Sequence, residues 1–186
     1  MRMRTDLVSG RFDMDVKAVG LSGPLTDRLW LGKRIGERAE WAFLEAGIPF
    51  EADLSGSEHQ GRFLVRSDVA ITRDAVAAFV DAVGEDDASW HIEGRLANFI
   101  SDLSFGDDGP WLVYLAPGGS VTPERIRSAE PLKIDPKERT LEVPLSEEHH
   151  GASHVELPIS DRLVIPTAHW LQLLWANLLG LGPHLW

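Results

Sequence analysis

The chain of 186 residues contains no cysteine, which excludes disulfide frameworks, thiolate zinc sites and thiol nucleophiles together. A chain without disulfides fits a reducing compartment, and the first residues lack the apolar core of a secretory signal. The sequence also lacks internal repeats and low-complexity tracts. We therefore expect a soluble, cytoplasmic protein.

Positive charge is scarce. The 18 Lys and Arg residues stand against 29 Asp and Glu, so the formal net charge is 18 − 29 = −11. A protein that binds a nucleic-acid backbone without sequence preference carries charge of the opposite sign. The sequence therefore predicts that nucleic acid is not a partner.

Long hydrophobic runs are also scarce, and the main one lies near the C-terminus, between Pro166 and Gly180. Thr167 is expected to cap a helix there, with apolar residues around most of its circumference. The apolar part is shorter than the ~20 residues that a membrane span requires, and it includes Gln172 and Asn177. We expect this helix to pack into the core or against another subunit rather than to enter a membrane.

The most informative stretch runs from Asp15 to Ile48. Residues 16–19 read as a short strand, residues 20–24 as a Gly/Pro turn, and residues 35–46 as a helix that Gly47 ends in a left-handed conformation. A strand that enters a helix through a glycine-bearing turn presents N–H groups to anions. This stretch therefore favours an α/β domain with an anion site.

A second strand–helix unit lies between Arg62 and Gly84. Residues 63–65 form an apolar run typical of a buried strand, and Thr72 is expected to cap a helix that Gly84 closes. Asp68 then follows the carboxyl end of a strand, which is where open α/β sheets place their ligands.

The whole pattern predicts a three-layer α/β fold with a mostly parallel central sheet. We divide the chain into an α/β domain over 1–165 and an apolar C-terminal helix and tail over 166–186. Residues 1–12 are expected to form a loose arm or an edge strand, and residues 96–105 either a short helix or a continued strand. Further strands are expected at 89–96, with Trp90 and Ile92 inward, at 111–115, around Leu141 and Val143, at 155–157 and at 163–165.

Several segments resemble the N-terminal part of sugar-1-phosphate nucleotidyltransferases. They are Lys17-Ala-Val, Leu21-Ser-Gly, Pro24-Leu-Thr-Asp-Arg28 and Glu45-Ala-Gly-Ile48, and Ser67-Asp68 stands where the family has Gly-Asp. The family's Gly-x-Gly-Thr-Arg loop is missing between Gly23 and Pro24, and no Pro-Lys pair follows Arg28.

The resemblance implies a reduced nucleotide-diphospho-sugar transferase (GT-A-like) topology. It implies transfer of a nucleotidyl group from a nucleoside triphosphate to a sugar 1-phosphate, with Mg²⁺ at Asp68. Positive charge for catalysis would come from Arg28 and Lys33. Substrate binding would involve Ser22, Gly23 and Thr26.

The alternative is a catalytically inactive homologue that serves as a binding module or as a homo-oligomeric assembly module through its C-terminal helix. The missing glycine loop favours this alternative, whereas Asp68 and residues 24–26 favour the enzyme. His149, His150 and His154 raise a zinc site as a further possibility, but a solvated loop is the better interpretation. His169 is expected to be a structural hydrogen-bonding residue rather than a base.

Overall fold

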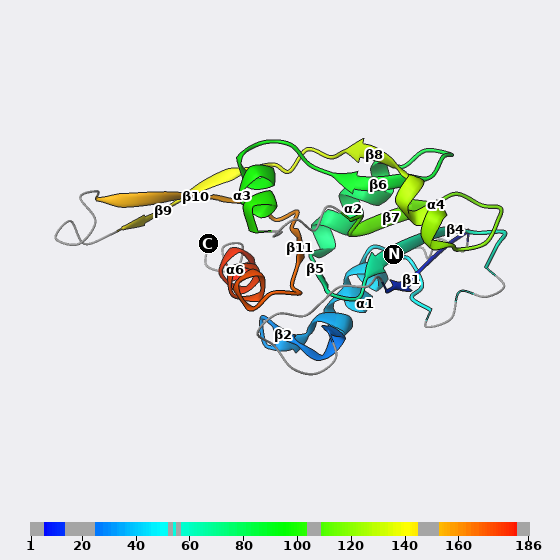
Figure 1. The fold of residues 1–186 in the computed structure, drawn as a ribbon, viewed down its shortest axis with the longest axis horizontal. Helices are drawn as coiled ribbons and strands as arrows, with labels where there is room; N and C mark the ends of the chain where they lie inside the picture. Colours follow the sequence, from blue (N-terminus) through cyan, green and yellow to red (C-terminus); the bar gives the residue numbers. More distant parts are fainter. Residues whose placement is uncertain are drawn as a thin grey trace.

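The main sheet of the protein has five strands, of which four run in the same direction. The computed structural model describes residues 6–13, 25–51, 54, 57–103, 109–144 and 153–181. The strands of the main sheet are β1 (Leu7–Phe12), β4 (Gly61–Arg66), β6 (Ala88–His91), β7 (Leu112–Leu115) and β8 (Glu130–Lys133). Their order is β1-β4-β7-β6-β8, and β7 runs antiparallel to both of its neighbours (Figure 1). The predicted α/β class is confirmed, with a mixed sheet.

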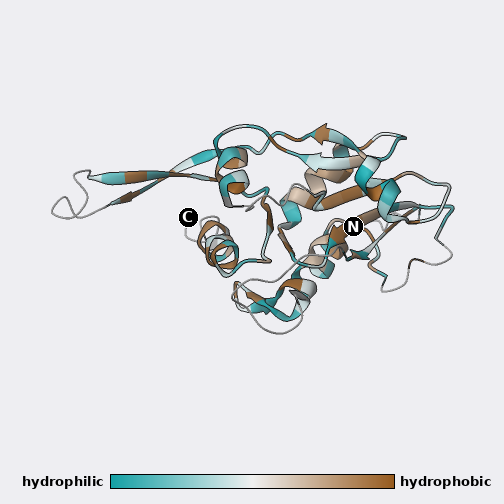
Figure 2. Cartoon of the chain, in the orientation of Figure 1, coloured by the Kyte–Doolittle hydropathy of each residue, from teal (hydrophilic) through white to brown (hydrophobic). Residues whose placement is uncertain are grey.

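Helices cover both faces of this sheet. Every residue of β4 and β7 is buried, and β7 is strongly hydrophobic along its length (Figure 2). Phe63 and Val65 point into the larger core cluster, together with residues of α1 (Ile35–Glu45), α2 (Arg73–Ala82) and α3 (Arg95–Leu103). Leu64 points the other way and packs in a smaller cluster with Ile126 of α4 (Pro123–Ser128). Adjacent strand residues therefore contribute to opposite cores, as the pleat requires.

The two helices expected from apolar spacing are present, and three of their four ends lie close to the predicted positions. α1 stops at Glu45, and Gly47 adopts φ +81° while its N–H donates to the Leu44 carbonyl at 3.0 Å. Glycine adopts this left-handed conformation at little energetic cost, which explains why the helix ends here. The Thr72 hydroxyl accepts a hydrogen bond from the Ala75 N–H at 3.3 Å and caps α2. α2 ends at Ala82, and Val83 is its cap in place of the expected Gly84.

A separate two-stranded ladder joins the middle of the chain to its C-terminal part. β5 (Val69–Ile71) pairs antiparallel with β11 (Val164–Pro166), so that Val69 lies opposite Pro166. α6 (Trp170–Leu181) follows and packs one face on the core through Ala176 and Leu179. In the described part of the chain, no helix is both long enough and apolar enough to cross a membrane.

The prediction that Thr167 caps the C-terminal helix is wrong. Its hydroxyl donates instead to the Asp68 carbonyl at 2.5 Å, because β11 brings the two residues together. His169 occupies the helix start: its Nδ1 accepts from the Leu171 N–H at 3.1 Å, and its own N–H donates to Gln172 Oε1 at 2.7 Å. The structural role expected for His169 is confirmed.

β9 (Arg139–Pro144) and β10 (His154–Ile159) form an antiparallel ribbon that projects from the body of the molecule (Figure 1). The strand expected around Leu141 and Val143 is thus present. Residues 95–103 are helical, which decides between the two expectations for that segment, and the strand expected over 89–96 ends at His91. α4 and β8 are additions that the sequence interpretation missed.

The segment before α1 is only partly described. η1 (Leu25–Asp27) leads into the short hairpin β2 (Leu29–Trp30) and β3 (Lys33–Arg34). β1 pairs only with β4 in the main sheet, which confirms an edge strand at the start of the chain. The expected strand at 16–19, the turn at 20–24 with Ser22 and Gly23, and the residues His149 and His150 lie outside the described residues.

Candidate functional site

The turn that follows β4 holds charged side chains in the interior of the protein. Arg66 and Asp68 are 2% and 0% exposed. Arg66 Nε lies 2.5 Å from Asp68 Oδ1, and Arg66 Nη2 lies 2.9 Å from Oδ2. This two-pronged geometry is the favourable one for a guanidinium and a carboxylate. The sequence places them for it, because Arg66 ends the strand and Asp68 follows after a single residue.

Arg28 adds a second guanidinium to this cluster. Its side chain is 7% exposed and its Nη1 donates to the Thr167 carbonyl, while Nε and Nη2 have no hydrogen-bond partner. Burial lowers the pKa of Arg28, and the negative charge of Asp68 acts in the opposite direction. Two buried cations therefore face one carboxylate, and the cluster of Arg28, Arg66 and Asp68 carries excess positive charge.

The structure brings two of the predicted site residues together, since Arg28 and Asp68 share this cluster. Lys33 is exposed in β3, and Thr26 is half-buried in η1. Sequence analysis missed Arg66. The sequence feature that could have indicated Arg66 is an arginine at the end of an apolar strand, two residues before an aspartate that it can pair with.

The oxygens of Asp68 already accept hydrogen bonds from Arg66. A Mg²⁺ ion at Asp68 needs a second carboxylate, for which Asp27, Asp102 and Asp161 are the candidates in the sequence. The carboxylates of Asp27 and Asp161 are 53% and 45% exposed and Asp102 is exposed on α3, whereas Asp68 is fully buried. Within the described residues, no group of three or more His, Asp or Glu side chains is placed to hold a metal ion. Magnesium at Asp68 remains a prediction from the resemblance.

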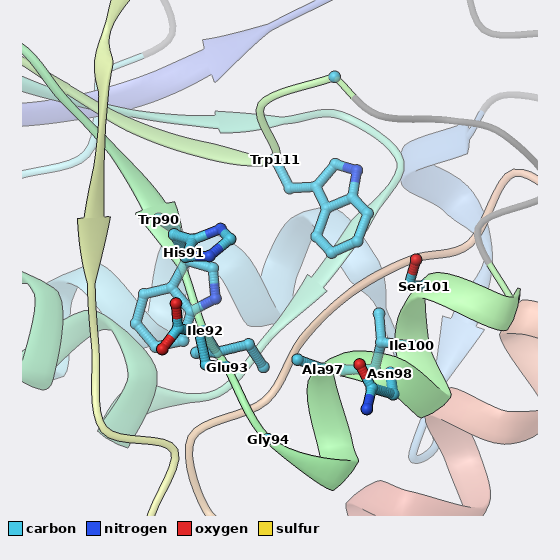
Figure 3. Close-up of a pocket in the computed structure, with 11 residues that line it drawn as sticks. Trp90, His91, Ile92, Glu93, Gly94, Ala97, Asn98, Ile100, Ser101 and Trp111 are labelled. Atoms are coloured by element: carbon cyan, nitrogen blue, oxygen red, sulfur yellow. The ribbon is translucent and has the colours of Figure 1, made fainter.

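A groove of about 480 Å³ lies between β6, α3 and the segment that enters β7 (Figure 3). This volume is in the range of small-molecule sites, ~300–1,000 Å³. Residues from these three elements and from the connection between β6 and α3 line it: Trp90, His91, Ile92, Glu93, Gly94, Ala97, Asn98, Ile100, Ser101, Gly109 and Trp111.

Two of the residues that line this groove carry hydrogen-bond donors that are unused. The indole Nε1 atoms of Trp90 and Trp111 are buried and have no acceptor. Trp90 is 8% exposed and is fixed by Phe79, whose ring meets it edge-on with centroids 6.0 Å apart. A buried donor without an acceptor costs roughly 1–3 kcal/mol. Figure 3 shows both indole rings bordering the same space above Ala97 and Ile100.

The remaining lining divides into an apolar floor and a polar rim. Ile92 and Ile100 are buried, whereas His91, Asn98 and Ser101 are exposed. Among the described residues that line the groove there is no Lys or Arg. Glu93 is the acidic residue among them, and its carboxylate forms an ion pair with Lys133 at 2.7 Å. The groove therefore offers hydrogen bonds and apolar contact without net positive charge.

Glu138 fixes the position of α3, which forms one wall of the groove. Its Oε1 accepts a hydrogen bond from the Leu96 N–H at 2.7 Å and thereby satisfies a free donor at the helix start. Gly94 precedes the helix with φ +111°, and a Cβ there would lie 2.6 Å from Glu138 Oε1. Glycine is required because both the conformation and the carboxylate exclude a side chain.

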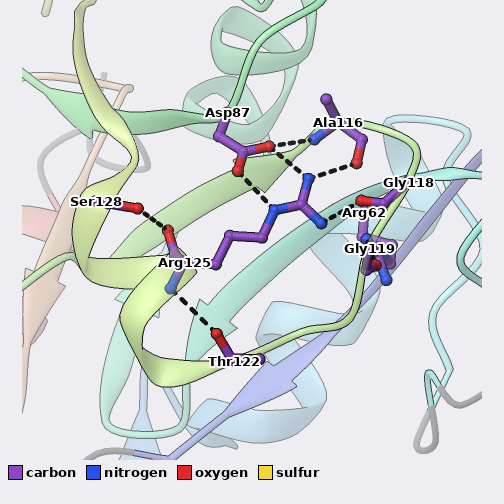
Figure 4. A network of polar contacts seen from close by, with 8 residues as sticks. All are labelled: Arg62, Asp87, Ala116, Gly118, Gly119, Thr122, Arg125 and Ser128. Atoms are coloured by element: carbon purple, nitrogen blue, oxygen red, sulfur yellow. Dashed lines mark hydrogen bonds and ion pairs between the residues drawn. The ribbon is translucent and has the colours of Figure 1, made fainter.

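A second polar cluster joins α4 through Arg125 to the residue before β6 and to the loop after β7 (Figure 4). Arg125 Nε and Nη2 donate to Asp87 at 2.6 and 2.7 Å, and Arg125 also donates to the carbonyls of Ala116 and Gly118. Asp87 accepts from the Ala116 N–H as well, at 2.8 Å. Arg125 and Asp87 satisfy each other, so their role is to hold the loop after β7.

Comparison of the chain with family models, with curated proteins and with solved structures finds no match. The function must therefore be inferred from the groove and from the buried cluster of Arg28, Arg66 and Asp68.

Proposed function

We propose that the protein is a binding module for a small neutral sugar, which occupies the groove between Trp90 and Trp111. The observation that carries this proposal is the pair of buried indole N–H donors without acceptors. Both nitrogens are covered in the structure, so a ligand with oxygen acceptors would satisfy them only after the indole rings turn toward the groove, and that gain would contribute to affinity. A protein with this function binds its ligand without catalysing a reaction.

The chemistry of the lining favours a sugar over other small molecules. A monosaccharide presents hydroxyl oxygens that accept hydrogen bonds and a C–H face that suits Ile92, Ile100 and the indole rings. Its hydroxyl protons match the oxygens of Asn98 and Ser101. A phosphorylated ligand is disfavoured, because none of the described lining residues is Lys or Arg and the chain carries a net charge of −11.

Titration with glucose, galactose, mannose and N-acetylglucosamine, followed by tryptophan fluorescence and by NMR of the ligand, tests the proposal. Trp111→Phe keeps a smaller aromatic ring and removes the N–H donor, so we expect binding to weaken roughly tenfold. Trp175→Phe is the matched control, because Trp175 packs against Phe99 at 4.9 Å and does not line the groove. Absence of binding by every sugar, or equal affinity of the Trp111→Phe variant, would overturn the proposal.

Nucleotidyl transfer is a second candidate function, and Arg28 favours it. Two nitrogens of this buried guanidinium have no partner and it lies beside Asp68, the residue to which the resemblance assigns Mg²⁺. Positive charge that is held in the interior stabilises the phosphoryl groups of a substrate. In this reaction a sugar 1-phosphate oxygen attacks the α-phosphate of a nucleoside triphosphate, and pyrophosphate leaves.

Thermal unfolding with nucleoside triphosphates and sugar 1-phosphates, with and without Mg²⁺, tests the second candidate. We expect Mg²⁺-dependent stabilisation that is lost in Arg28→Gln and kept in Trp111→Phe. Release of pyrophosphate reports the reaction itself. The absence of both stabilisation and pyrophosphate would exclude transfer and leave the sugar site untouched, so the two proposals fail separately.

A further inference from the structure

A second pocket, of about 230 Å³, opens between α1, the start of α2 and the end of α6. It is smaller than the ~300–1,000 Å³ of most small-molecule sites, so it suits a ligand with a single ring. Apolar surface comes from Trp30, Leu31, Trp41 and Ile71. The pocket shares none of its described lining residues with the groove of Figure 3, so the two are separate sites.

Contacts between α6 and the β2–β3 hairpin hold one side of this pocket in place. Trp30 Nε1 donates to the Ala176 carbonyl at 2.8 Å, and the Leu31 N–H donates to Asn177 Oδ1 at 2.9 Å. Gly180 lies so close that a Cβ there would be 2.9 Å from Trp30 Nε1. The helix and the hairpin lie side by side in Figure 1. A pocket that is already formed loses little conformational freedom when it binds a ligand.

Arg38 supplies a cation with a fixed position in the pocket. Its Nε and Nη2 donate to the carbonyls of Trp30 and Leu31, each at 2.6 Å. The guanidinium also lies over the Trp30 ring, 5.4 Å from the ring centroid, which is a favourable cation–π distance. The third nitrogen, Nη1, makes no hydrogen bond to the described part of the chain, so it keeps both of its hydrogens for a ligand.

The charge of Arg38 has no carboxylate partner among the described residues. Burial lowers the pKa of Arg38, and no acidic group in that part of the chain acts in the opposite direction. In Arg28, by contrast, the same effect of burial is opposed by Asp68. A partly buried cation whose hydrogen bonds go only to carbonyls can therefore gain a charge-assisted hydrogen bond from an incoming anion.

The other charged residues that line the pocket are compensated. Arg73 and Asp74 are adjacent, exposed and of opposite charge. Asp161 borders the pocket, but its carboxylate forms an ion pair with Arg139 at 2.7 Å. Of the described lining residues, Arg38 therefore leaves one positive charge without a counter-charge.

Trp41 provides surface for a flat ring next to this charge. It follows Arg38 by three residues on α1, so the two side chains lie on the same side of the helix. Trp41 is 49% exposed, whereas Ile71 adds buried aliphatic surface from β5. Aromatic rings gain from contact with each other beyond the area that they bury. The pocket therefore combines one cation with one open aromatic surface.

We propose that this pocket binds a small aromatic carboxylate, with its carboxylate at the guanidinium of Arg38 and its ring against the indole of Trp41. An aliphatic acid would match the charge and lack the ring contact. A doubly charged phosphate ester would meet a single uncompensated cation. The site depends neither on the sugar groove nor on the cluster of Arg28, Arg66 and Asp68.

Titration of the full chain with benzoate and with benzamide, followed by NMR of the ligand, tests this site. Benzamide has the same ring without the charge, so we expect benzoate to bind at least roughly tenfold more tightly. Arg38→Met should remove that difference, and Trp41→Ala should weaken benzoate binding about fivefold. Arg34→Met is the matched control, because it removes an exposed positive charge from a residue that is not among the described lining.

Equal binding of benzoate and benzamide, or binding of neither, would overturn the proposal, as would a benzoate affinity that Trp41→Ala leaves unchanged. Benzoate binding that Arg34→Met weakens as much as Arg38→Met would reduce the effect to overall charge and also overturn it. Weaker benzoate binding in Trp111→Phe would place the ligand in the groove of Figure 3 instead. Circular dichroism establishes that each variant is folded; if Arg38→Met is not, the benzamide comparison and Trp41→Ala decide.

Discussion

At the residue scale, Asp68 is the counter-charge for both Arg28 and Arg66. Asp68→Asn leaves two buried guanidinium groups without it, and we expect a loss of about 3–5 kcal/mol in the free energy of unfolding. Arg66→Met leaves Asp68 beside Arg28, so its cost should be smaller. Urea unfolding of the two variants at pH 7 measures the difference.

The double variant Arg66→Met/Asp68→Leu provides a control for this asymmetry. Removing an ion pair as a unit costs less than breaking it, so the double variant should be more stable than Asp68→Asn. If Asp68→Asn proves as stable as the parent chain, the carboxylate does not hold the cluster together.

Asp87 links stability to pH. Burial raises the pKa of Asp87, but hydrogen bonds from Arg125 and the Ala116 N–H, with the charges of Arg125 and Arg62, outweigh burial and hold it below the ordinary value of 3.8. A carboxyl group with a lowered pKa stabilises the fold at pH values above 3.8. This contribution is lost as the pH falls from 3.8 through the pKa of the folded state.

Asp87→Asn should therefore cost about 1–3 kcal/mol at pH 7, with the difference from the parent chain shrinking as the pH falls below 3.8. Urea unfolding at a series of pH values measures the change. Glu93→Gln is the control: its pKa is lowered by the hydrogen bond and the charge of Lys133, but the pair is exposed, so little change is expected. A cost of Asp87→Asn that does not vary with pH would contradict the assignment.

At the element scale, the Thr72 hydroxyl connects α2 to the segment before β11. It caps α2 by accepting a hydrogen bond from the Ala75 N–H. It also donates to the Asp161 carbonyl at 2.6 Å and accepts from the Leu163 N–H at 3.0 Å. Thr122 caps α4 through the Arg125 N–H at 3.2 Å. We expect Thr72→Ala to cost about 2–3 kcal/mol and Thr122→Ala about 1 kcal/mol.

Thermal and urea unfolding of the two threonine variants measure this contrast. Thr72→Ser keeps the oxygen atom and should recover most of the loss. Equal costs for Thr72→Ala and Thr122→Ala would mean that the contacts to Asp161 and Leu163 add nothing to the cap.

Elements with a strong local signal could be predicted from the sequence. α1 and α2 have apolar residues at helical spacing and defined ends at Gly47 and Thr72. α4 was missed because Ile126 is its one buried residue, so its sequence looks like a polar loop. β5 was also missed, because a three-residue strand is defined by its partner β11, far away in the sequence. Thr167 was misassigned for the same reason.

At the scale of the whole molecule, part of the candidate site was accessible from the sequence. Arg28 and Asp68 lie in the segments that carry the family resemblance, and they meet in the fold. The groove was not predicted, because Trp90 and Trp111 border one space only through the placement of α3 beside them. That placement depends on Glu138, which belongs to a later part of the chain.

The link between Asp68 and Thr167 sets an order of events during translation. Thr167 is the hydrogen-bond partner of both the Asp68 carbonyl and the Arg28 side chain. It is synthesised 99 positions after Asp68 and 139 positions after Arg28. A nascent chain that is halted on the ribosome before residue 164 leaves the edge of β5 open and the guanidinium of Arg28 without its carbonyl. We expect such arrested chains to be cut rapidly by proteases, and resistance to arise only once β11 and α6 have left the exit tunnel.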